Sequence, residues 1–93
     1  MSYLLRYHPD VLRIDLSDID RKLAARIGAA IEQRLTTHPT DYGSPLRHTL
    51  KGYWKLRVGD YRVVYRIVSQ EVRIVAIMHR SHVYERLGKR IND

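Results

Sequence analysis

The sequence predicts an α+β fold, in which two N-terminal helices pack on one face of a small, mainly antiparallel sheet. Two observations favour this class. Apolar residues recur with helical spacing between Asp10 and Thr36, whereas the chain from Leu46 onward is rich in β-branched and aromatic residues. The resulting order is β-α-α-β-β-β, with a C-terminal helix or ordered tail, and it places the helices together on the sheet. All 93 residues (1–93) are expected to form a single domain.

The chain is expected to begin with a strand over residues 2–7, in which Tyr3, Leu5 and Tyr7 share one face. A short helix is then expected over Asp10–Ile19. Its apolar residues are Val11, Leu12, Ile14, Leu16 and Ile19.

A longer second helix is expected to start at a cap on Ser17 or Asp18, because short polar side chains accept hydrogen bonds from the free amides of a first turn. It should end near Thr36. Its apolar stripe recurs every four residues, at Leu23, Ile27, Ile31 and Leu35. Charged residues mostly lie off this stripe and are expected to face solvent: Arg21, Lys22, Arg26, Glu32 and Arg34.

Turn-forming residues fill the segment His38–Pro45 and end the helical half. Gly59 and Asp60 fit a two-residue hairpin turn of the type that has glycine first. Strands are expected at Leu46–Leu50, Tyr53–Val58, Tyr61–Val68 and Val72–Met78, and Val83–Ile91 is expected to form the terminal helix or tail.

That hairpin turn fixes a register. One face then pairs Val58 with Tyr61, Leu56 with Val63 and Trp54 with Tyr65, and the helices should cover it. The opposite face pairs Arg57 with Arg62, Lys55 with Val64 and Tyr53 with Arg66. If an even-length loop at Ser69 and Gln70 continues the register, Arg73 lies opposite Arg66, Ile77 lies opposite Arg62, and His79 shares the face of Arg57 and Arg62.

One face of the sheet is therefore expected to be basic. It gathers Lys55, Arg57, Arg62, Arg66, Arg73 and His79, with Tyr53 nearby. Like charges directly opposite each other cost stability, and binding of a polyanion is the simplest reason to keep them. The whole chain is also basic, with 17 Lys and Arg against 10 Asp and Glu, as expected of a nucleic-acid-binding domain. The alternative is an ordinary solvated face, although such faces usually mix the two signs of charge.

Several classes of protein are disfavoured. The chain has no cysteine, and its histidines lack metal-ligand spacing, so we expect neither a metal nor a cofactor. It has no phosphate-binding glycine loop of the Walker type and no carboxylate pair suited to glycoside hydrolysis. The N-terminus lacks the pattern of a secretory signal, and no apolar run is long enough to span a membrane. We therefore expect a cytoplasmic protein.

Two runs of sequence, LKGYWKLRVGDYRVVYRI and VAIMHRSHVYERL, resemble the RelE/ParE superfamily of bacterial type II toxins. The likeness extends over nearly the whole chain. It implies a RelE-like fold and an mRNA endonuclease, acting on the ribosome or on free mRNA, that a cognate antitoxin neutralises in a toxin–antitoxin hetero-oligomer. In the RelE branch, catalysis is assigned to basic residues on the concave sheet face and to a C-terminal tyrosine.

Five residues of this chain match those positions: Lys55, Arg57, Arg62, Arg80 and Tyr84. His79 stands beside Arg80, and all six are the expected catalytic residues. Tyr53, Arg66 and Arg73 are the expected further contacts to RNA. The chain departs from a simple run of alternating basic residues, because Tyr53 stands where a third cation could be and Trp54 follows it. The number of catalytic cations is therefore open.

Metal-independent RNA cleavage requires deprotonation of the 2′-hydroxyl, stabilisation of the phosphorane charge and protonation of the leaving oxygen. Arg57 and Arg62, with Arg80 as a third, are expected to stabilise that charge. Lys55 or Tyr84 could act as the base, because clustered cations lower the pKa of a neighbouring lysine or tyrosine. His79 could act as acid or base.

Two other functions share this fold class. The first is a ParE-like toxin that inhibits DNA gyrase and cleaves nothing. The second is a non-catalytic module whose basic face binds RNA or an antitoxin. Gathered cations and titratable groups favour the nuclease, since a gyrase inhibitor does not need them.

Overall fold

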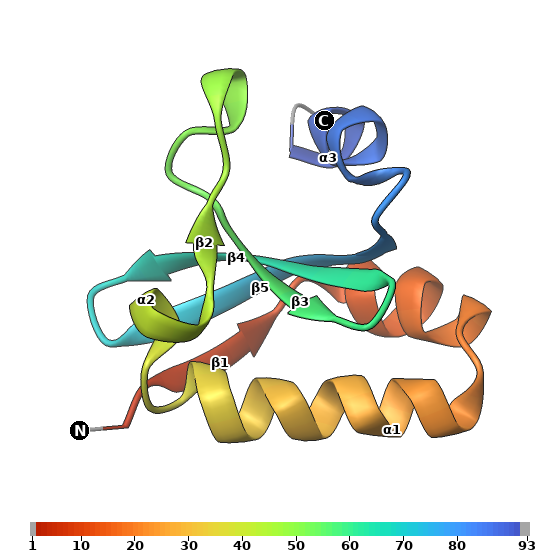
Figure 1. The fold of residues 1–93 in the computed structure, drawn as a ribbon, viewed down its shortest axis with the longest axis horizontal. Helices are drawn as coiled ribbons and strands as arrows, with labels where there is room; N and C mark the ends of the chain where they lie inside the picture. The colour runs from red at the N-terminus through yellow and green to blue at the C-terminus, as the bar shows by residue number, and fades with distance from the viewer. Residues whose placement is uncertain (1, 92–93) are drawn as a thin grey trace.

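The computed structural model describes residues 2–91, which form a five-stranded sheet with helical segments on both of its faces (Figure 1). The strand order is β1-β5-β4-β3-β2. β1 runs parallel to β5, and all other neighbouring strands are antiparallel, so the predicted mainly antiparallel sheet and α+β class are confirmed. The strands are β1 (Leu4–Tyr7), β2 (Ser44–Pro45), β3 (Trp54–Val58), β4 (Tyr61–Val68) and β5 (Glu71–His79).

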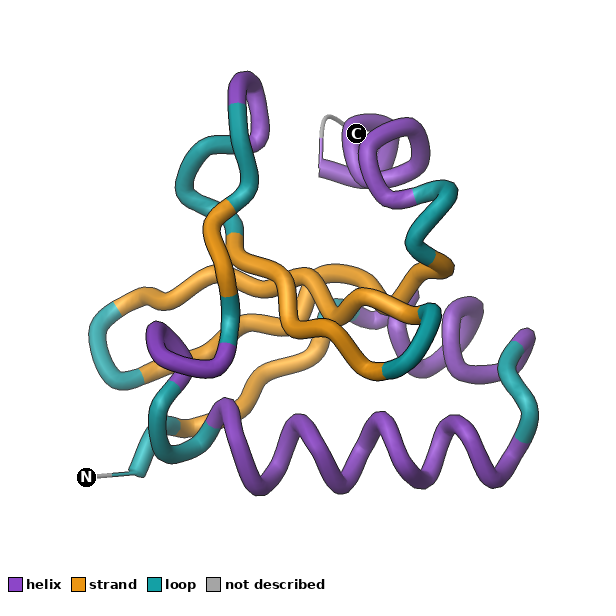
Figure 2. The backbone as a smooth tube through the Cα atoms, viewed as in Figure 1, coloured by secondary structure: helices purple, strands orange, loops and turns teal. Residues whose placement is uncertain are grey.

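Two successive helical segments cover one face of the sheet, as the sequence predicted (Figure 2). The first segment consists of η1 (Val11–Asp15) and η2 (Leu16–Asp18). The second consists of α1 (Arg21–Ala30), which continues into η3 (Ile31–Leu35). Tyr3, Leu5 and Tyr7 pack beneath the same face, as expected.

The predicted cap of the second helix was wrong. The N-cap of α1 is Asp20, not Ser17 or Asp18. The Asp20 carboxylate accepts hydrogen bonds from the amides of Lys22 at 3.1 Å and Leu23 at 3.3 Å. The Ser17 hydroxyl is already engaged at the end of the preceding segment, where it donates to the carbonyls of two residues of that segment. The two helical segments are thus separated by an extended residue rather than joined at a shared cap.

The main core lies between these helices and the sheet. Ile27, Ile31 and Leu35 have no exposed surface, which confirms the predicted stripe. The strands contribute Leu56, Val58, Val63, Tyr65, Val72, Ile74 and Ile77.

The side chain of Tyr65 holds the segment that leads into β2. Its hydroxyl donates to the carbonyl of Pro39 at 2.6 Å, and burial raises the pKa of the phenol. Gly43 lies against this hydroxyl so closely that a Cβ atom there would be 1.8 Å from it. A glycine is therefore required where the chain crosses Tyr65 and enters β2.

A second apolar cluster lies on the opposite face of the sheet. It is formed by Leu46, Leu50, Val64, Ala76, Met78, Val83 and Leu87. The last two belong to α3 (Val83–Ile91), so the C-terminal segment is a helix and it lies across the sheet from α1 (Figure 1). This face was expected to be basic and solvent-exposed, with Val64 among its cations, but α3 and the Leu46–Leu50 segment cover its centre and make it a small core.

The expected strand Leu46–Leu50 was wrong. The chain pairs with β3 through Ser44 and Pro45, and the amide of Leu46 makes one further hydrogen bond, to the carbonyl of Tyr53 at 2.9 Å. It then leaves the sheet, forms a short 3₁₀ turn η4 (His48–Leu50), and buries Leu46 and Leu50 in the second cluster. The segment expected to be turns also contains a single helical turn, α2 (Pro39–Tyr42).

A β-bulge in β5 changes the predicted register. Val64 pairs with Ala76, but the next residue, Tyr65, pairs with Ile74, so that Val75 is an extra residue. Beyond the bulge every side chain of β5 is on the opposite face from the one expected. Arg62 therefore lies opposite Met78, whereas Ile77 is buried in the main core.

Candidate functional site

The hairpin of β3 and β4 has the predicted register. Val58 pairs with Tyr61 across a turn in which Gly59 has a φ angle of +59°, a conformation that favours glycine. Arg57 consequently lies directly opposite Arg62 on the face of the sheet away from α1.

Three arginines meet at this turn: Arg57, Arg62 and Arg80, which we call the turn-end cluster. Arg80 follows β5 and joins the turn, because its amide donates to the carbonyl of Asp60 at 2.8 Å. Its guanidinium is 3.8 Å from the Asp60 carboxylate and remains largely exposed. The cluster therefore combines residues from β3, β4 and the end of β5.

The Arg62 guanidinium is held in place by the backbone. Its Nη1 donates to the carbonyls of Gly59 and Tyr61, at 3.0 Å each. Partial burial lowers the pKa of Arg62, and the charges of Arg57 and Arg80 lower it further, while Asp60 opposes them. The part of this pKa shift that comes from Arg57 and Arg80 reflects neighbouring positive charge, which a bound anion would offset.

The opposite end of the same face is different. Arg66 and Arg73 lie opposite each other, as predicted, and with Glu71 and Arg6 they form what we call the far-end network. Glu71 accepts hydrogen bonds from Arg73 at 2.6 Å and from Arg6 at 2.9 Å. Arg66 lies over the ring of Tyr53, with 5.3 Å between its Cζ atom and the ring centroid.

Lys55 lies between the two ends, on the basic side of β3. It is half-buried and pairs with the buried Val64. The basic face thus has cations at each end and an apolar centre formed by the second cluster.

The predicted placement of His79 was wrong. The bulge pairs it with Tyr61, on the other face from Arg57 and Arg62, and the two rings meet edge to face at 5.6 Å. The amide of Ser81 donates to Nδ1 of His79 at 3.2 Å, and the hydroxyl of Ser81 lies 2.8 Å from the same atom. Because Nδ1 accepts, Nε2 carries the proton of the neutral ring.

Tyr84 stands in the first turn of α3, above the face that carries the turn-end cluster, and is 53% exposed. Val83 and Leu87, which are buried on the sheet, hold this end of the helix down. The side chain of Tyr84 is therefore accessible to a ligand.

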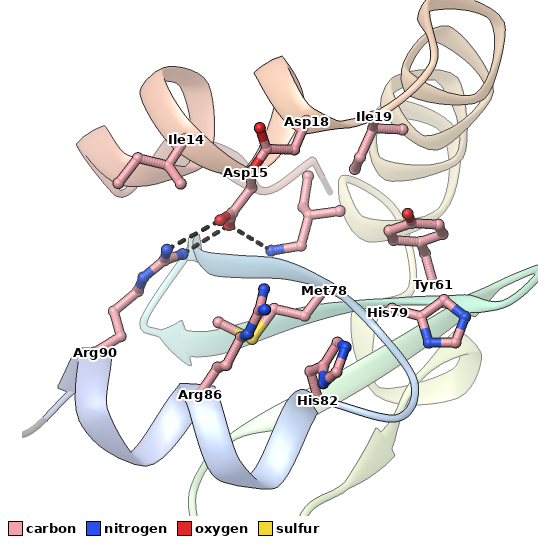
Figure 3. A pocket seen from close by; sticks show the side chains of 11 residues that line it. Ile14, Asp15, Asp18, Ile19, Tyr61, Met78, His79, His82, Arg86 and Arg90 are labelled. Carbon is pink, nitrogen blue, oxygen red and sulfur yellow. Dashed lines mark hydrogen bonds and ion pairs between the residues drawn. The ribbon is translucent and has the colours of Figure 1, made fainter.

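An ion pair that the sequence did not predict anchors the other end of α3 (Figure 3). The Arg90 guanidinium donates to both carboxylate oxygens of Asp15, at 2.6 and 2.9 Å, and also to the carbonyl of Val75 at 3.2 Å. Asp15 in turn accepts from the amide of Ile77 at 2.8 Å. The side chains of Asp15 and Arg90 thus provide hydrogen-bond partners for the Ile77 amide and the Val75 carbonyl, which lie on β5 beyond the last residue paired with β1. A carboxylate within the apolar run VLRIDL was the one available signal.

No helix within residues 2–91 is long and apolar enough to cross a membrane.

Comparisons with known proteins agree with this fold. Residues 4–84 match the family described as the ParE toxin of the type II toxin-antitoxin system parDE. The chain is 31% identical over 88 residues to the toxin RelG of Mycobacterium tuberculosis, covering 92% of this chain and 100% of that protein. It is 39% identical over 72 residues to the toxin RelE of the same organism, covering 75% and 74%.

A solved structure is also similar. The RelBE2 toxin–antitoxin complex of M. tuberculosis contains a chain with a TM-score of 0.75 and 29% identity, and the match covers 85% of this chain and 99% of that one.

Proposed function

This chain belongs to the RelE/ParE superfamily of type II toxin–antitoxin toxins, and from that premise we propose that it is a metal-independent endoribonuclease that cleaves mRNA on the ribosome. Cleavage would stop translation. The observation that carries the proposal is the turn-end cluster, where three guanidinium groups gather at one exposed edge and one of them is held by backbone carbonyls.

Such a cluster suits phosphoryl transfer. In the proposed step, the 2′-oxygen of the RNA attacks the adjacent phosphorus, a base removes the 2′-proton, and the bond to the 5′-oxygen breaks as that oxygen receives a proton. The products are a 2′,3′-cyclic phosphate and a 5′-hydroxyl. Negative charge grows on the non-bridging oxygens, and fixed guanidinium groups stabilise it through charge-assisted hydrogen bonds without reorganising.

We assign Arg57, Arg62 and Arg80 to this charge stabilisation. Lys55 and Tyr84 are the proposed proton-transfer groups, since both lie on the side of the sheet that carries Arg57 and Arg62. His79 is not part of this assignment, because it faces the opposite side of β5. Tyr53 and Arg66 would extend the RNA contact along the sheet.

A cognate antitoxin is the proposed protein partner. The similar chain in the RelBE2 structure comes from a toxin–antitoxin complex, which supports the same kind of hetero-oligomer here. The basic sheet face offers an acidic or amphipathic antitoxin segment a complementary surface.

Inhibition of DNA gyrase is the second candidate, because the matching family is described by its ParE toxin. The two relatives with at least 30% identity carry RelG and RelE names and so favour the nuclease. Fold alone does not separate the two.

Induced expression in bacteria, with primer extension on a reporter mRNA, tests the proposal. Wild type should arrest growth and produce discrete cuts. Arg62→Ala and Tyr84→Phe should lose both while remaining folded, and Arg21→Ala, which removes an exposed cation from α1, should behave as wild type. Arrest without cuts would overturn the nuclease and favour gyrase or another target.

A further inference from the structure

A cavity of about 480 Å³ lies beside the C-terminal half of β5, between η1, η2 and α3 (Figure 3). β1 pairs with β5 only as far as Ile74, so within residues 2–91 the β1-side edge of β5 has no partner strand beyond that point, while β4 continues along the other edge. The volume falls in the range of small-ligand sites.

Three rings line one part of the cavity. Tyr61 meets His79 at 5.6 Å, and His79 meets His82 at 6.1 Å between ring centroids. Ile14, from η1, and Ile19, which directly follows η2, lie across the cavity from α3 (Figure 3). A flat ring entering this space would have aromatic side chains on one side and aliphatic side chains on the other.

The polar groups of the cavity have both signs of charge. Asp15 and Arg90 neutralise each other. Asp18, which comes from η2, offers acceptors, and Arg86, which comes from α3, offers donors. A lining with balanced charge fits neither a simple anion nor a simple cation. It fits a neutral planar group with donors and acceptors on its edge, which describes a nucleobase.

The cavity adjoins the turn-end cluster along the chain. Tyr61 precedes Arg62, and His79 precedes Arg80, so neighbouring residues place a ring on the α1 side of the sheet and a guanidinium on the other side. His82 and Arg86 line the cavity from the α3 side, which is the side of the cluster, so an RNA chain that reaches both sites passes around this edge of β5. We propose that the cavity binds an unstacked RNA base next to the phosphate held by the turn-end cluster, and that it thereby influences where the RNA is cut. The link to cutting rests on the proposed nuclease function.

A nuclear magnetic resonance titration of the full chain tests base binding without any need for cleavage. Each of the four nucleoside 5′-monophosphates would be compared with ribose 5-phosphate. At least one nucleotide should shift the backbone amides of Ile77, His79 and His82, whereas ribose 5-phosphate should not.

Matched variants test the chemistry. His82→Ala should weaken binding of that nucleotide about fivefold or more, the low end of base–aromatic stacking, whereas His82→Phe keeps a ring and should stay within about twofold of wild type. Arg86→Gln should weaken it, whereas Lys89→Gln, an equal loss of charge from an exposed position of α3, should not.

Two results would overturn the proposal. The first is that the nucleotides and ribose 5-phosphate shift the same amide signals, or that the nucleotides shift only amides of the turn-end cluster. The second is RNA cleavage by folded His82→Ala and Arg86→Gln variants with an unchanged distribution of bases at the cut site. If the wild type bound a base in the cavity but cut no RNA, the cavity assignment would stand and the nuclease would fall.

Discussion

The two ends of the basic sheet face place arginines opposite each other in the same way but balance their charge differently. At the far end, Glu71 accepts hydrogen bonds from Arg73 and Arg6 on either side of it. At the turn end, Arg62 is held by uncharged carbonyls, and the Asp60 carboxylate is 3.8 Å from the guanidinium of Arg80.

This difference shows that a count of cations does not locate a phosphate site. Each end has three arginines and one carboxylate, but at the far end Glu71 is hydrogen-bonded to two of the arginines. At the turn end, Asp60 lies 3.8 Å from the guanidinium of Arg80, and Arg57 and Arg80 remain exposed to a ligand. The placement of carboxylates, more than that of arginines, therefore distinguishes the two ends.

The largest expected effect comes from removing one arginine from each end. Arg62→Ala should lower the cleavage rate by a factor on the order of 10²–10³, as loss of one preorganised donor to a developing oxyanion does. Arg73→Ala should change it by less than about threefold, because its guanidinium is paired with Glu71. Single-turnover cleavage of a reporter mRNA on ribosomes would measure both. Equal losses would show that the two ends act alike.

A buried carboxylate provides the second contrast. Asp15→Ala would leave Arg90 without its partner in a nearly buried position, and we expect a loss of about 3 kcal/mol in the free energy of unfolding. Glu71→Ala should cost much less than Asp15→Ala, because its arginines are exposed and water screens the pairs. Urea unfolding monitored by circular dichroism would compare them. A small cost for Asp15→Ala would mean that α3 does not depend on this anchor.

A substitution that keeps the charge sharpens the comparison further. Arg62→Lys retains a cation but loses the planar group that can bond carbonyls and phosphate together, so the cleavage rate should fall about tenfold. Arg66→Lys at the other end should have little effect. Full activity in Arg62→Lys would reduce the role of Arg62 to that of a point charge.

The sequence was sufficient to predict the hairpin and the opposition of Arg57 to Arg62. A two-residue turn with glycine first, and strands that alternate in polarity, specify one register. Both are local features, so no knowledge of the rest of the fold was needed.

The bulge at Val75 had no such signal. The run VRIVAIM is apolar at nearly every position, because the second cluster buries this part of β5 on the face away from α1 as well. Alternation therefore could not reveal the extra residue, and His79 was placed on the wrong face. The pairing of Asp15 with Arg90 joins residues 75 positions apart and depends on the docking of α3, which sequence pattern does not specify.

A smaller effect is expected when the far end is released from its carboxylate. Glu71→Gln should free Arg73 and Arg6 for phosphate, raise RNA affinity about twofold to fivefold at low salt, and steepen the dependence of log Kd on log salt by about one. Fluorescence anisotropy with a labelled single-stranded RNA would measure both quantities. Glu32→Gln, which removes an exposed acid from η3, is the control. An unchanged salt slope would show that the RNA does not reach the far end.

The smallest effect is a pH dependence of stability from the same residue. Hydrogen bonds from Arg73 and then Arg6 hold the pKa of the Glu71 carboxyl below its ordinary value of 4.5. Since the folded state favours the charged form, this stabilisation is present above pH 4.5 and is lost as the pH falls through the lowered pKa. The difference in urea midpoint between wild type and Glu71→Gln should therefore shrink below pH 4.5, and the other titrating groups cancel in that difference. If the urea midpoints of wild type and Glu71→Gln changed in parallel with pH, the charged form of Glu71 would not stabilise the folded state through Arg73 and Arg6. The positive charge of the far end would then be no better balanced than that of the turn end.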